Sequence, residues 1–338
     1  MSPGTAKDSP ERPWIGAQRN ALLAQRGHAW LLHGPSGLGQ FELALALVRA
    51  WLCESPGAHG ACGHCASCHA IDVHTHADLC VLMPEGDMLE RGWPLPQKAQ
   101  AELDDKKRKP SREIRVDAMR EVVEFSQRTS ARGRGKAVLV YPAEQMNGIT
   151  ANALLKTLEE PPGDMRFVLA TTAAHQLLPT IRSRCLGHAM VWPEHGAMLQ
   201  WLGGQGMPAE AAETFLRAAG GRPGDALALA RSGRSPDAWA QLPQALLRGE
   251  PGALAGHSPA QAIEALQKLC HDLLARAVGA TPRYFAAADL PAAPALARLS
   301  AWSRALATQA RTADHPFNAG LMLEALAAEA RNALNSKP

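Results

Sequence analysis

Two groups of residues in this sequence have the types and spacings of chemical sites, and the first is a glycine-rich run. The run His33-Gly34-Pro35-Ser36-Gly37-Leu38-Gly39-Gln40-Phe41 keeps the glycine spacing of the phosphate-binding motif G-x-x-x-x-G-K-[ST]. Gln40 and Phe41, however, stand where the motif has Lys and Ser or Thr. In the motif, the Lys neutralises the β- and γ-phosphates and the hydroxyl of the Ser or Thr ligates Mg²⁺. The pattern therefore predicts a phosphate-type loop that lacks the groups that use ATP, although Gly34 to Gly37 also fits an ordinary turn.

The second group consists of four cysteines spaced C-x8-C-x2-C-x2-C, namely Cys53, Cys62, Cys65 and Cys68. Thiolates at this spacing can share one tetrahedral Zn²⁺, and a closed shell of four sulfurs leaves no position for a catalytic water. We therefore predict a structural zinc site. Four unrelated thiols are the alternative, and a neighbouring histidine could replace one sulfur; the candidates are His59, His64, His69, His74 and His76. The other cysteines, Cys80, Cys185 and Cys270, are scattered and are interpreted as small buried residues.

Composition bounds the class of protein. The chain has 338 residues, 46% hydrophobic and 20% charged, which is enough for two or three globular domains. The formal net charge of +3 gives no strong global field for nucleic acid. Apolar runs fall short of the ~18 residues of a membrane span, and the N-terminus lacks a signal-peptide core. We expect a cytoplasmic protein with no membrane contact, in which clustered cysteines bind metal rather than form disulfides.

A phosphate-type loop has to be held between a strand and a helix, and the sequence supplies both. Strands are predicted at 29–33, 79–83, 136–141 and 166–171, and helices at 14–27, 41–52, 116–128 and 152–160. A short turn or helix is predicted at 178–185, and helical runs at 260–278, 295–312 and 318–334. Residues 84–110 break every periodicity and are predicted to be a solvated loop, with the charged run 104–109 facing water.

The strand predicted at 136–141 bears on the chemistry of the loop. In an ATPase of this layout such a strand ends in Asp-Glu, where the Asp supports Mg²⁺ and the Glu polarises the attacking water. Here Tyr141 and Pro142 occupy those positions, followed by Ala143 and Glu144. A second catalytic element is therefore missing from the sequence.

Several separated motifs resemble the bacterial clamp-loader family. They are the helix Asn152-Ala-Leu-Leu-Lys-Thr-Leu-Glu-Glu-Pro-Pro162, the run Ile181-Arg-Ser-Arg-Cys185, the cysteine module after the loop helix, and the opening stretch 14–39. These elements occur in the family's order across residues 14–192, and the resemblance is thin afterwards. Loss of both the loop Lys and the acidic strand end resembles the family's non-catalytic member.

The resemblance implies an α/β fold: an AAA+ P-loop module with a parallel sheet, a small helical lid and an all-α collar. On this interpretation residues 1–192 form the AAA+ domain, with the zinc module at 53–68; residues 193–235 form the lid and 236–338 the collar. Family ATPases place an Arg that senses the γ-phosphate just ahead of the position of Asp225. This chain has Gly224 there, with Arg222 nearby.

The resemblance also implies a function. Clamp loaders open a ring-shaped sliding clamp and place it around primed DNA, using ATP bound between neighbouring subunits. Arg184 of Ser183-Arg184-Cys185 would act in trans as an arginine finger in the ATP site of a neighbour. The partners would be gamma/tau and delta subunits of the DNA polymerase III assembly. Arg184 could instead be an ordinary surface arginine, with Arg182 as its neighbouring control.

Alternatives of other classes remain open at this point. The chain could be an active ATPase with a non-standard site, or a zinc-stabilised DNA-binding protein unrelated to a loader. Lys156 and Glu159 fit either a simple intrahelical pair or a helix near a subunit interface or DNA. The sequence leaves undecided whether the loop retains a nucleotide, how far the chain contacts DNA directly, what residues 84–110 do, and the subunit stoichiometry.

Overall fold

The computed structural model describes residues 12–250, 252–312 and 318–335. The N-terminus, for which the sequence predicts no signal-peptide core, lies largely outside these residues. The chain divides into two compact units, Met1–Ala197 and Met198–Pro338, which are described separately. The first unit contains both groups of candidate site residues, so it is described in more detail.

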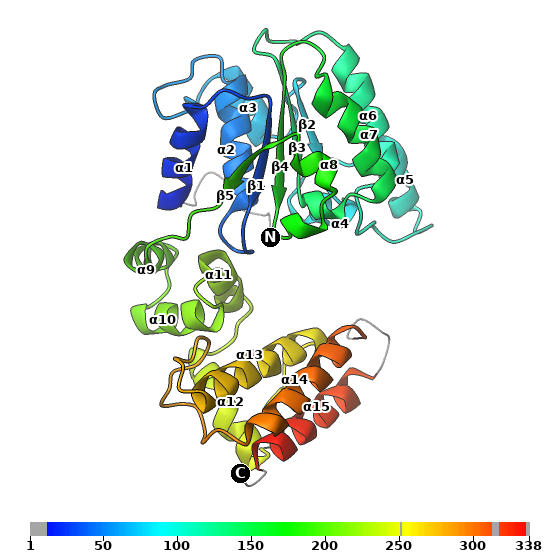
Figure 1. Ribbon diagram of the computed structural model, residues 1–338. Helices are drawn as coiled ribbons and strands as arrows, with labels where there is room; N and C mark the ends of the chain where they lie inside the picture. The colour runs from blue at the N-terminus through cyan, green and yellow to red at the C-terminus, as the bar shows by residue number, and fades with distance from the viewer. Residues whose placement is uncertain (1–11, 251, 313–317, 336–338) are drawn as a thin grey trace. The chain divides into compact units, whose positions relative to one another are not determined.

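The described part of the first unit is built on a parallel five-stranded sheet (Figure 1). Its strands are β1 (Ala29–His33), β2 (Leu79–Leu82), β3 (Lys136–Val140), β4 (Met165–Thr171) and β5 (Leu186–Ala189), in the order β2-β3-β4-β1-β5. Neighbouring pairs are parallel throughout. The central strands are almost entirely buried, which explains why they appear in the sequence as continuous apolar runs. The predicted α/β class with a parallel sheet is confirmed.

The edge strand β5 is absent from the predicted strands. Its residues Leu186, Gly187 and Ala189 are exposed, so the segment carries neither a continuous apolar run nor a clear alternation. What makes it a strand is its pairing with β1, in which Trp30 lies opposite Leu186. Tertiary pairing thus supplies a strand that local sequence does not mark.

Helices cover both faces of the sheet, as a buried parallel sheet requires (Figure 1). On one side lie α1 (Pro13–Leu23), α2 (Gln40–Leu52) and α3 (Ala66–Asp72). On the other lie α6 (Val116–Gln127) and α7 (Gly148–Glu159), which pack on β2, β3 and β4 in one hydrophobic cluster. The short α8 (Pro179–Arg182) connects β4 to β5. The sheet therefore has a fixed carboxyl edge at which the glycine-rich run emerges.

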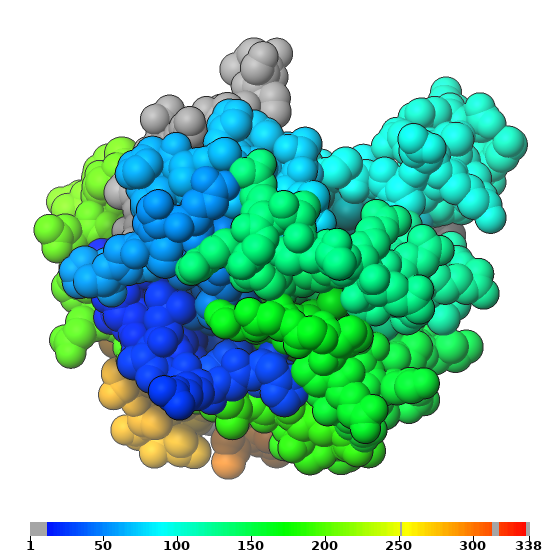
Figure 2. Space-filling view, turned by 90° about the horizontal axis from the view of Figure 1, so that it is seen from above, coloured from blue at the N-terminus to red at the C-terminus, as the bar shows by residue number. Residues whose placement is uncertain are grey.

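The prediction of an unstructured solvated loop over 84–110 is wrong. The segment forms two helices, α4 (Glu85–Glu90) and α5 (Gln97–Asp104), each with a proline, Pro84 or Pro96, at its N-cap position. Arg108, expected to face water, instead pairs with Glu85 and Glu102 and ties the segment together. The prolines that break the periodicity start these helices rather than exclude them. In Figure 2 this cyan segment projects from the rest of the first unit.

The regular secondary structure of the second unit is entirely helical among its described residues. Its helices are α9 (His195–Gly204, whose first turn belongs to the first unit), α10 (Ala209–Ala218), α11 (Pro223–Arg231), α12 (Pro236–Arg248), α13 (Pro259–Ala277), α14 (Leu296–Ala310) and α15 (Ala319–Leu334). The last four share one apolar core with Ala218 of α10. A boundary between lid and collar at 235/236, and one between AAA+ domain and lid at 192/193, stay predictions. Among the helices described, none has the length and hydropathy to cross a bilayer.

Candidate functional site

The glycine-rich run connects β1 to α2, as the phosphate-loop motif requires. Gly39 caps α2 with φ +100°, a left-handed conformation that favours glycine. Gly34 lies so close to Met190 that an added Cβ would come within 2.9 Å of the methionine Cβ. The run is therefore a strand-to-helix loop of the phosphate-binding type rather than an isolated turn.

The side chain of Gln40 occupies the interior of this loop. It is only 2% exposed, and its Nε2 donates hydrogen bonds to the backbone oxygens of Gly34 at 2.8 Å and Pro35 at 2.6 Å. The oxygen of Leu38 accepts a further bond from the indole of Trp14 at 2.8 Å. A motif lysine would carry its charge out to a phosphate, whereas Gln40 folds back and closes the loop on itself.

Phe41 belongs to an aromatic cluster at the sheet edge. Its ring centroid lies 5.3 Å from that of Tyr141, and the guanidinium carbon of Arg91 lies 4.4 Å from the Phe41 centroid and 5.2 Å from the Tyr141 centroid. Burial raises the pKa of the Tyr141 phenol, which keeps it neutral. Phe41 and Tyr141 occupy the two positions that would serve Mg²⁺ in an ATPase, and here they hold a cation of the chain itself.

The carboxylate of Glu144 lies near this edge. The Oε1 of Glu144 accepts hydrogen bonds from the backbone N–H of Thr172 at 3.0 Å and from its hydroxyl at 2.8 Å. Thr172 directly follows β4, whose last residue pairs with His33 of β1. Glu144 is therefore engaged in holding the chain after β4.

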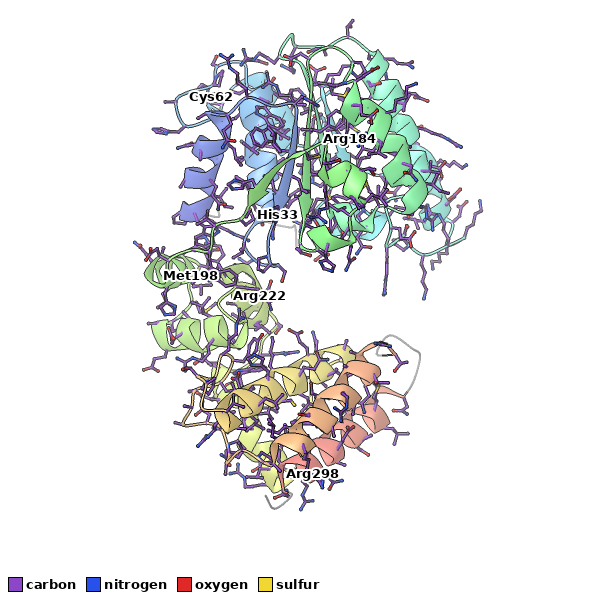
Figure 3. All side chains as sticks on the ribbon, viewed as in Figure 1. His33, Cys62, Arg184, Met198, Arg222 and Arg298 are labelled. Atoms are coloured by element: carbon purple, nitrogen blue, oxygen red, sulfur yellow. The ribbon has the colours of Figure 1, made fainter. Side chains whose placement is uncertain are left out.

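Arg184 lies away from the loop of its own chain. It lies two residues before β5, whose Leu186 pairs near the start of β1, whereas the glycine-rich run begins at His33, at the other end of β1 (Figure 3). Its Nε donates to Glu159 at 2.5 Å and its Nη1 to the oxygen of Thr180 at 3.0 Å, while the side chain remains 34% exposed. A guanidinium so placed can act only on a group outside this chain's own loop.

The residues around Arg184 have simpler surroundings. Arg182 and Ser183 are exposed, and the Ser183 hydroxyl donates to the oxygen of Thr180 at 3.1 Å. Within the described residues the ion pair of Glu159 is with Arg184 and not with Lys156, so the intrahelical pair proposed for α7 is wrong. Glu159 of α7 thus pairs with an arginine that follows α8, and not with the lysine three residues earlier in its own helix.

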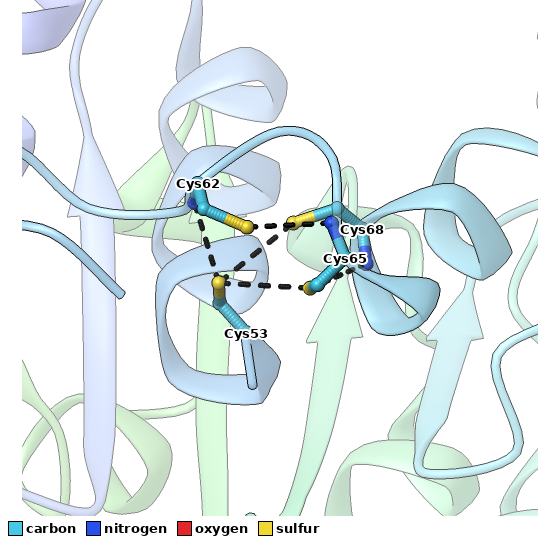
Figure 4. Close-up of side chains that lie close together, drawn as sticks. All are labelled: Cys53, Cys62, Cys65 and Cys68. Atoms are coloured by element: carbon cyan, nitrogen blue, oxygen red, sulfur yellow. Dashed lines mark hydrogen bonds between the residues drawn. The ribbon is translucent and has the colours of Figure 1, made fainter. Parts of the chain in front are cut away.

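The four predicted cysteines lie together (Figure 4). Their sulfur atoms all lie within 4.8 Å of one another, and the Cys53 sulfur is 3.8 Å from those of Cys65 and Cys68. A tetrahedral shell with Zn–S bonds near 2.3 Å requires sulfur separations of about 3.8 Å. Backbone N–H groups of Cys62, Cys65 and Cys68 point at cysteine sulfurs at 3.3 to 3.4 Å. The cluster therefore fits a metal ion held by four thiolates.

The thiols differ in acidity before any metal binds. Burial raises the pKa of Cys68 to about 12. Although burial opposes it, hydrogen bonds from the backbone amides of Cys68 and Glu54 lower the pKa of Cys65 to about 6. A divalent cation held by the four sulfurs would displace the protons that remain on them.

A chain of hydrogen bonds fixes the module to the sheet. Ser67, between Cys65 and Cys68, donates to Glu54 at 3.1 Å and contacts the buried ring of His76 at 3.1 Å. The His76 Nδ1 accepts the backbone N–H of Asp78 at 3.0 Å, and burial lowers the His76 pKa, so the ring is neutral. His76 is a supporting residue here and not a metal ligand.

The module and the loop lie at opposite ends of α2. This helix runs from Gln40 to Leu52, about 20 Å at 1.5 Å per residue, and Cys53 follows it directly. Figure 3 accordingly labels Cys62 and His33 at different ends of the first unit. A metal held at the cysteines would therefore lie about one helix length from the glycine-rich loop.

In the second unit, the side chain of Arg222 contacts residues close to it in the sequence. Its Nε lies 2.9 Å from the Asp225 carboxylate and donates to the Ala219 oxygen at 2.9 Å. Its guanidinium is thus held by groups next to the start of α11, and its role toward any phosphate stays a prediction.

Comparison with known proteins decides the family. A family model described as "DNA polymerase III, delta subunit" matches residues 17–190, which is 174 of the 338 residues. The chain belongs to this family. The resemblance to bacterial clamp loaders over residues 14–192 is thereby confirmed, and the parallel sheet agrees with the AAA+ fold that it implied.

The relatives narrow the type of delta subunit to delta-prime. DNA polymerase III subunit delta' of Pseudomonas aeruginosa is 42% identical over 62% of this chain, and that of Escherichia coli K12 is 36% identical over 64%. The Escherichia coli tau subunit is 33% identical over 51% of this chain and 23% of its own length. The alignments span 58% and 60% of the two delta' relatives, so what those whole proteins do comes to this chain only as a proposal.

Some functional neighbours were missed by sequence reasoning about this delta-family chain. Arg91 lies within the segment predicted as a loop, and no local pattern connects it to Phe41 and Tyr141. Glu54 and His76 support the cysteine module through Ser67. The crowding of histidines around the cysteines was the available signal for His76, but it indicated a possible ligand rather than a support.

Proposed function

We propose that this chain is a non-catalytic delta-prime-type subunit of the DNA polymerase III clamp loader. In that role it helps place the sliding clamp on primed DNA, within a cytoplasmic hetero-oligomer with gamma/tau and delta subunits. The observation that carries the proposal is the filled loop: Gln40 donates hydrogen bonds to two carbonyls of the loop itself, and Phe41 contacts the ring of Tyr141 and the guanidinium of Arg91. In the complex this chain would then contribute a side chain to the ATP site of a neighbouring subunit and would not hydrolyse ATP itself.

The loop geometry supports the view that the ATP site is degenerate. Three functions are replaced together: the lysine by Gln40, the Mg²⁺-binding hydroxyl by Phe41, and the acidic strand end by Tyr141 and Pro142. Removing one electrostatic stabiliser already costs ~10²–10³ in rate. The alternative of an active ATPase would need all three losses to be compensated, which is why we do not favour it.

We expect no measurable ATP hydrolysis by the isolated chain and weak or absent ATP binding. Titration calorimetry at millimolar Mg-ATP measures the binding, and phosphate release measures turnover. The double variant Gln40→Lys, Phe41→Thr should still be inactive, because Tyr141 and Pro142 supply no carboxylate for Mg²⁺ and water. Turnover by the wild-type chain would contradict the proposal of a degenerate site.

The cysteine module is proposed to hold one structural Zn²⁺ through Cys53, Cys62, Cys65 and Cys68. Sulfur separations near 3.8 Å and amides directed at the sulfurs support this metal, and soft thiolate ligands favour zinc over magnesium or calcium. The ion would fix the turn between α2 and α3, and no chemistry is assigned to it.

Arg184 is proposed as the donated group, with Ser183 beside it. Its guanidinium is partly exposed and lies away from its own loop, and its partner Glu159 is a surface carboxylate. An exposed pair of this kind contributes at most ~1 kcal/mol, so a neighbour's triphosphate can displace it. Arg184 can therefore exchange Glu159 for a phosphate of the adjacent subunit.

Reconstitution tests the function as a whole. The full chain is mixed with candidate gamma/tau and delta subunits, and the clamp- and DNA-stimulated ATPase is measured with and without it. We expect the chain to co-purify with the other subunits and to raise the stimulated rate, while the chain alone hydrolyses nothing. A chain that binds primed DNA tightly alone but does not enter the complex would favour the zinc-stabilised DNA-binding alternative.

A further inference from the structure

A second region of the first unit has the chemistry of an anion site, and it lies at the amino-terminal edge of the sheet. Here a cavity of about 930 Å³ is bounded by four stretches of chain: the end of α1 and the start of β1, the 56–60 loop, residues 133–134, and residues 161–166. Figure 2 looks onto this face, where the dark-blue, sea-green and green parts of the first unit adjoin. The glycine-rich run leaves the opposite edge of the sheet, so the two sites are separate.

The charges that line the cavity are predominantly positive. Arg26, Arg134 and Arg166 line it, and among the described lining residues Asp164 is the single acidic side chain. Asp164 lies 3.6 Å from Arg166. Arg26 and Arg134 are exposed and take part in none of the ion pairs found among the described residues. The guanidinium groups of Arg26 and Arg134 thus line the cavity without an ion pair to a described carboxylate.

Glycines form part of the wall between the arginines. Gly57, Gly133 and Gly163 line the cavity, and a Cβ added at any of them would meet nothing within 4 Å. The tryptophan rings in the wall are covered, since Trp30 is 3% and Trp51 9% exposed, and the ring of His28 contacts the backbone oxygen of Leu158 at 3.0 Å. The surface therefore offers guanidinium groups and open backbone, and its described lining has no exposed tryptophan, tyrosine or phenylalanine ring on which a base could stack.

We propose that this cavity binds the sugar-phosphate backbone of a nucleic acid strand. Guanidinium groups match phosphate oxygens with paired hydrogen bonds, and open glycines let a bulky backbone approach closely. Covered tryptophans exclude base stacking, so the contact is independent of sequence. An acidic peptide would also match the arginines, so the experiment includes one as a competitor. The proposal goes beyond the role proposed above, in which DNA is reached only through the complex.

The test compares two charge-matched double variants of the full chain. Arg26→Glu, Arg134→Glu removes the two unpaired arginines; Arg298→Glu, Arg304→Glu changes two exposed arginines of the second unit and alters net charge equally. Binding of a labelled single-stranded oligonucleotide of about twenty residues is measured by fluorescence anisotropy between about 50 and 200 mM salt. We expect the cavity variant to bind about tenfold more weakly, with a salt slope smaller by about 1.4, and the control to resemble the wild type.

Three other outcomes overturn the proposal. Equal losses in both variants would mean that net charge alone attracts the strand, and unchanged binding in both would place the contact elsewhere. A poly-glutamate peptide of matched charge that displaces the oligonucleotide equally well would assign the cavity to acidic peptides. Circular dichroism and cysteine-bound metal content, expected to be unchanged in both variants because the replaced side chains are exposed, check that folding is intact.

Discussion

Replacing Arg184 by alanine is expected to slow ATP turnover at one neighbouring site of the assembled complex by ~10³–10⁵-fold. The guanidinium would neutralise charge on the transferring phosphoryl group, and alanine leaves that charge uncompensated. Because only one of several ATP sites depends on this chain, the total rate should fall fractionally, unless the sites act in a coupled order. The measurement is the clamp- and DNA-stimulated ATPase of complexes reconstituted with wild-type or variant chain.

Two matched variants separate a donated group from an ordinary surface arginine. Arg182→Ala changes an exposed arginine two residues away and should leave the rate nearly unchanged. Arg184→Lys should rescue poorly, because an ammonium lacks the planar fork of a guanidinium. The isolated Arg184→Ala chain should stay folded, since the ion pair between Arg184 and Glu159 lies at the surface and adds little stability. Normal clamp loading by the Arg184→Ala complex would defeat the trans role.

Removal of the metal from the cysteine cluster is expected to be the largest effect on stability. Four thiols whose sulfurs lie within 4.8 Å of one another should hold about one Zn²⁺ per chain. Cys68→Ser removes a buried ligand, and we expect the free energy of unfolding to fall by about 3 kcal/mol or more, which corresponds to a Tm lower by roughly 6 to 12 °C. Elemental analysis and thermal unfolding of the same preparations measure both quantities.

The control for the metal is a cysteine outside the cluster. Cys185→Ser changes a partly buried thiol far from the four ligands in sequence and should leave the zinc content unchanged. Chelation should loosen residues 53–76 in hydrogen exchange while the glycine-rich loop, at the other end of α2, keeps its protection. Protein prepared without chelators that contains no zinc would refute the assignment.

Much of the first unit follows from local sequence. β1, β3 and β4 are recognisable as continuous apolar runs because both faces of a parallel sheet are buried. The cysteine cluster is recognisable because two-residue spacings bring thiols to one point whatever the surrounding fold. Gly34 and Gly39 indicate the strand-to-helix turn because larger residues are disfavoured there: a Cβ at position 34 would clash with Met190, and position 39 has a left-handed backbone conformation. In each case the signal lies within a few residues of the feature.

Contacts between distant segments were decided by the tertiary structure. The pairing of β5 with β1, the stacking of Arg91 on Phe41, and the pair of Arg184 with Glu159 join residues whose spacing carries no signal. The same holds for the cavity that gathers Arg26 and Arg134 from two loops and Arg166 from the start of β4 at one sheet edge. Strand order brings those segments together, and strand order depends on the burial of whole faces rather than on any local pattern. The residue types are set by the sequence, and which of them meet is set by the packing of the sheet.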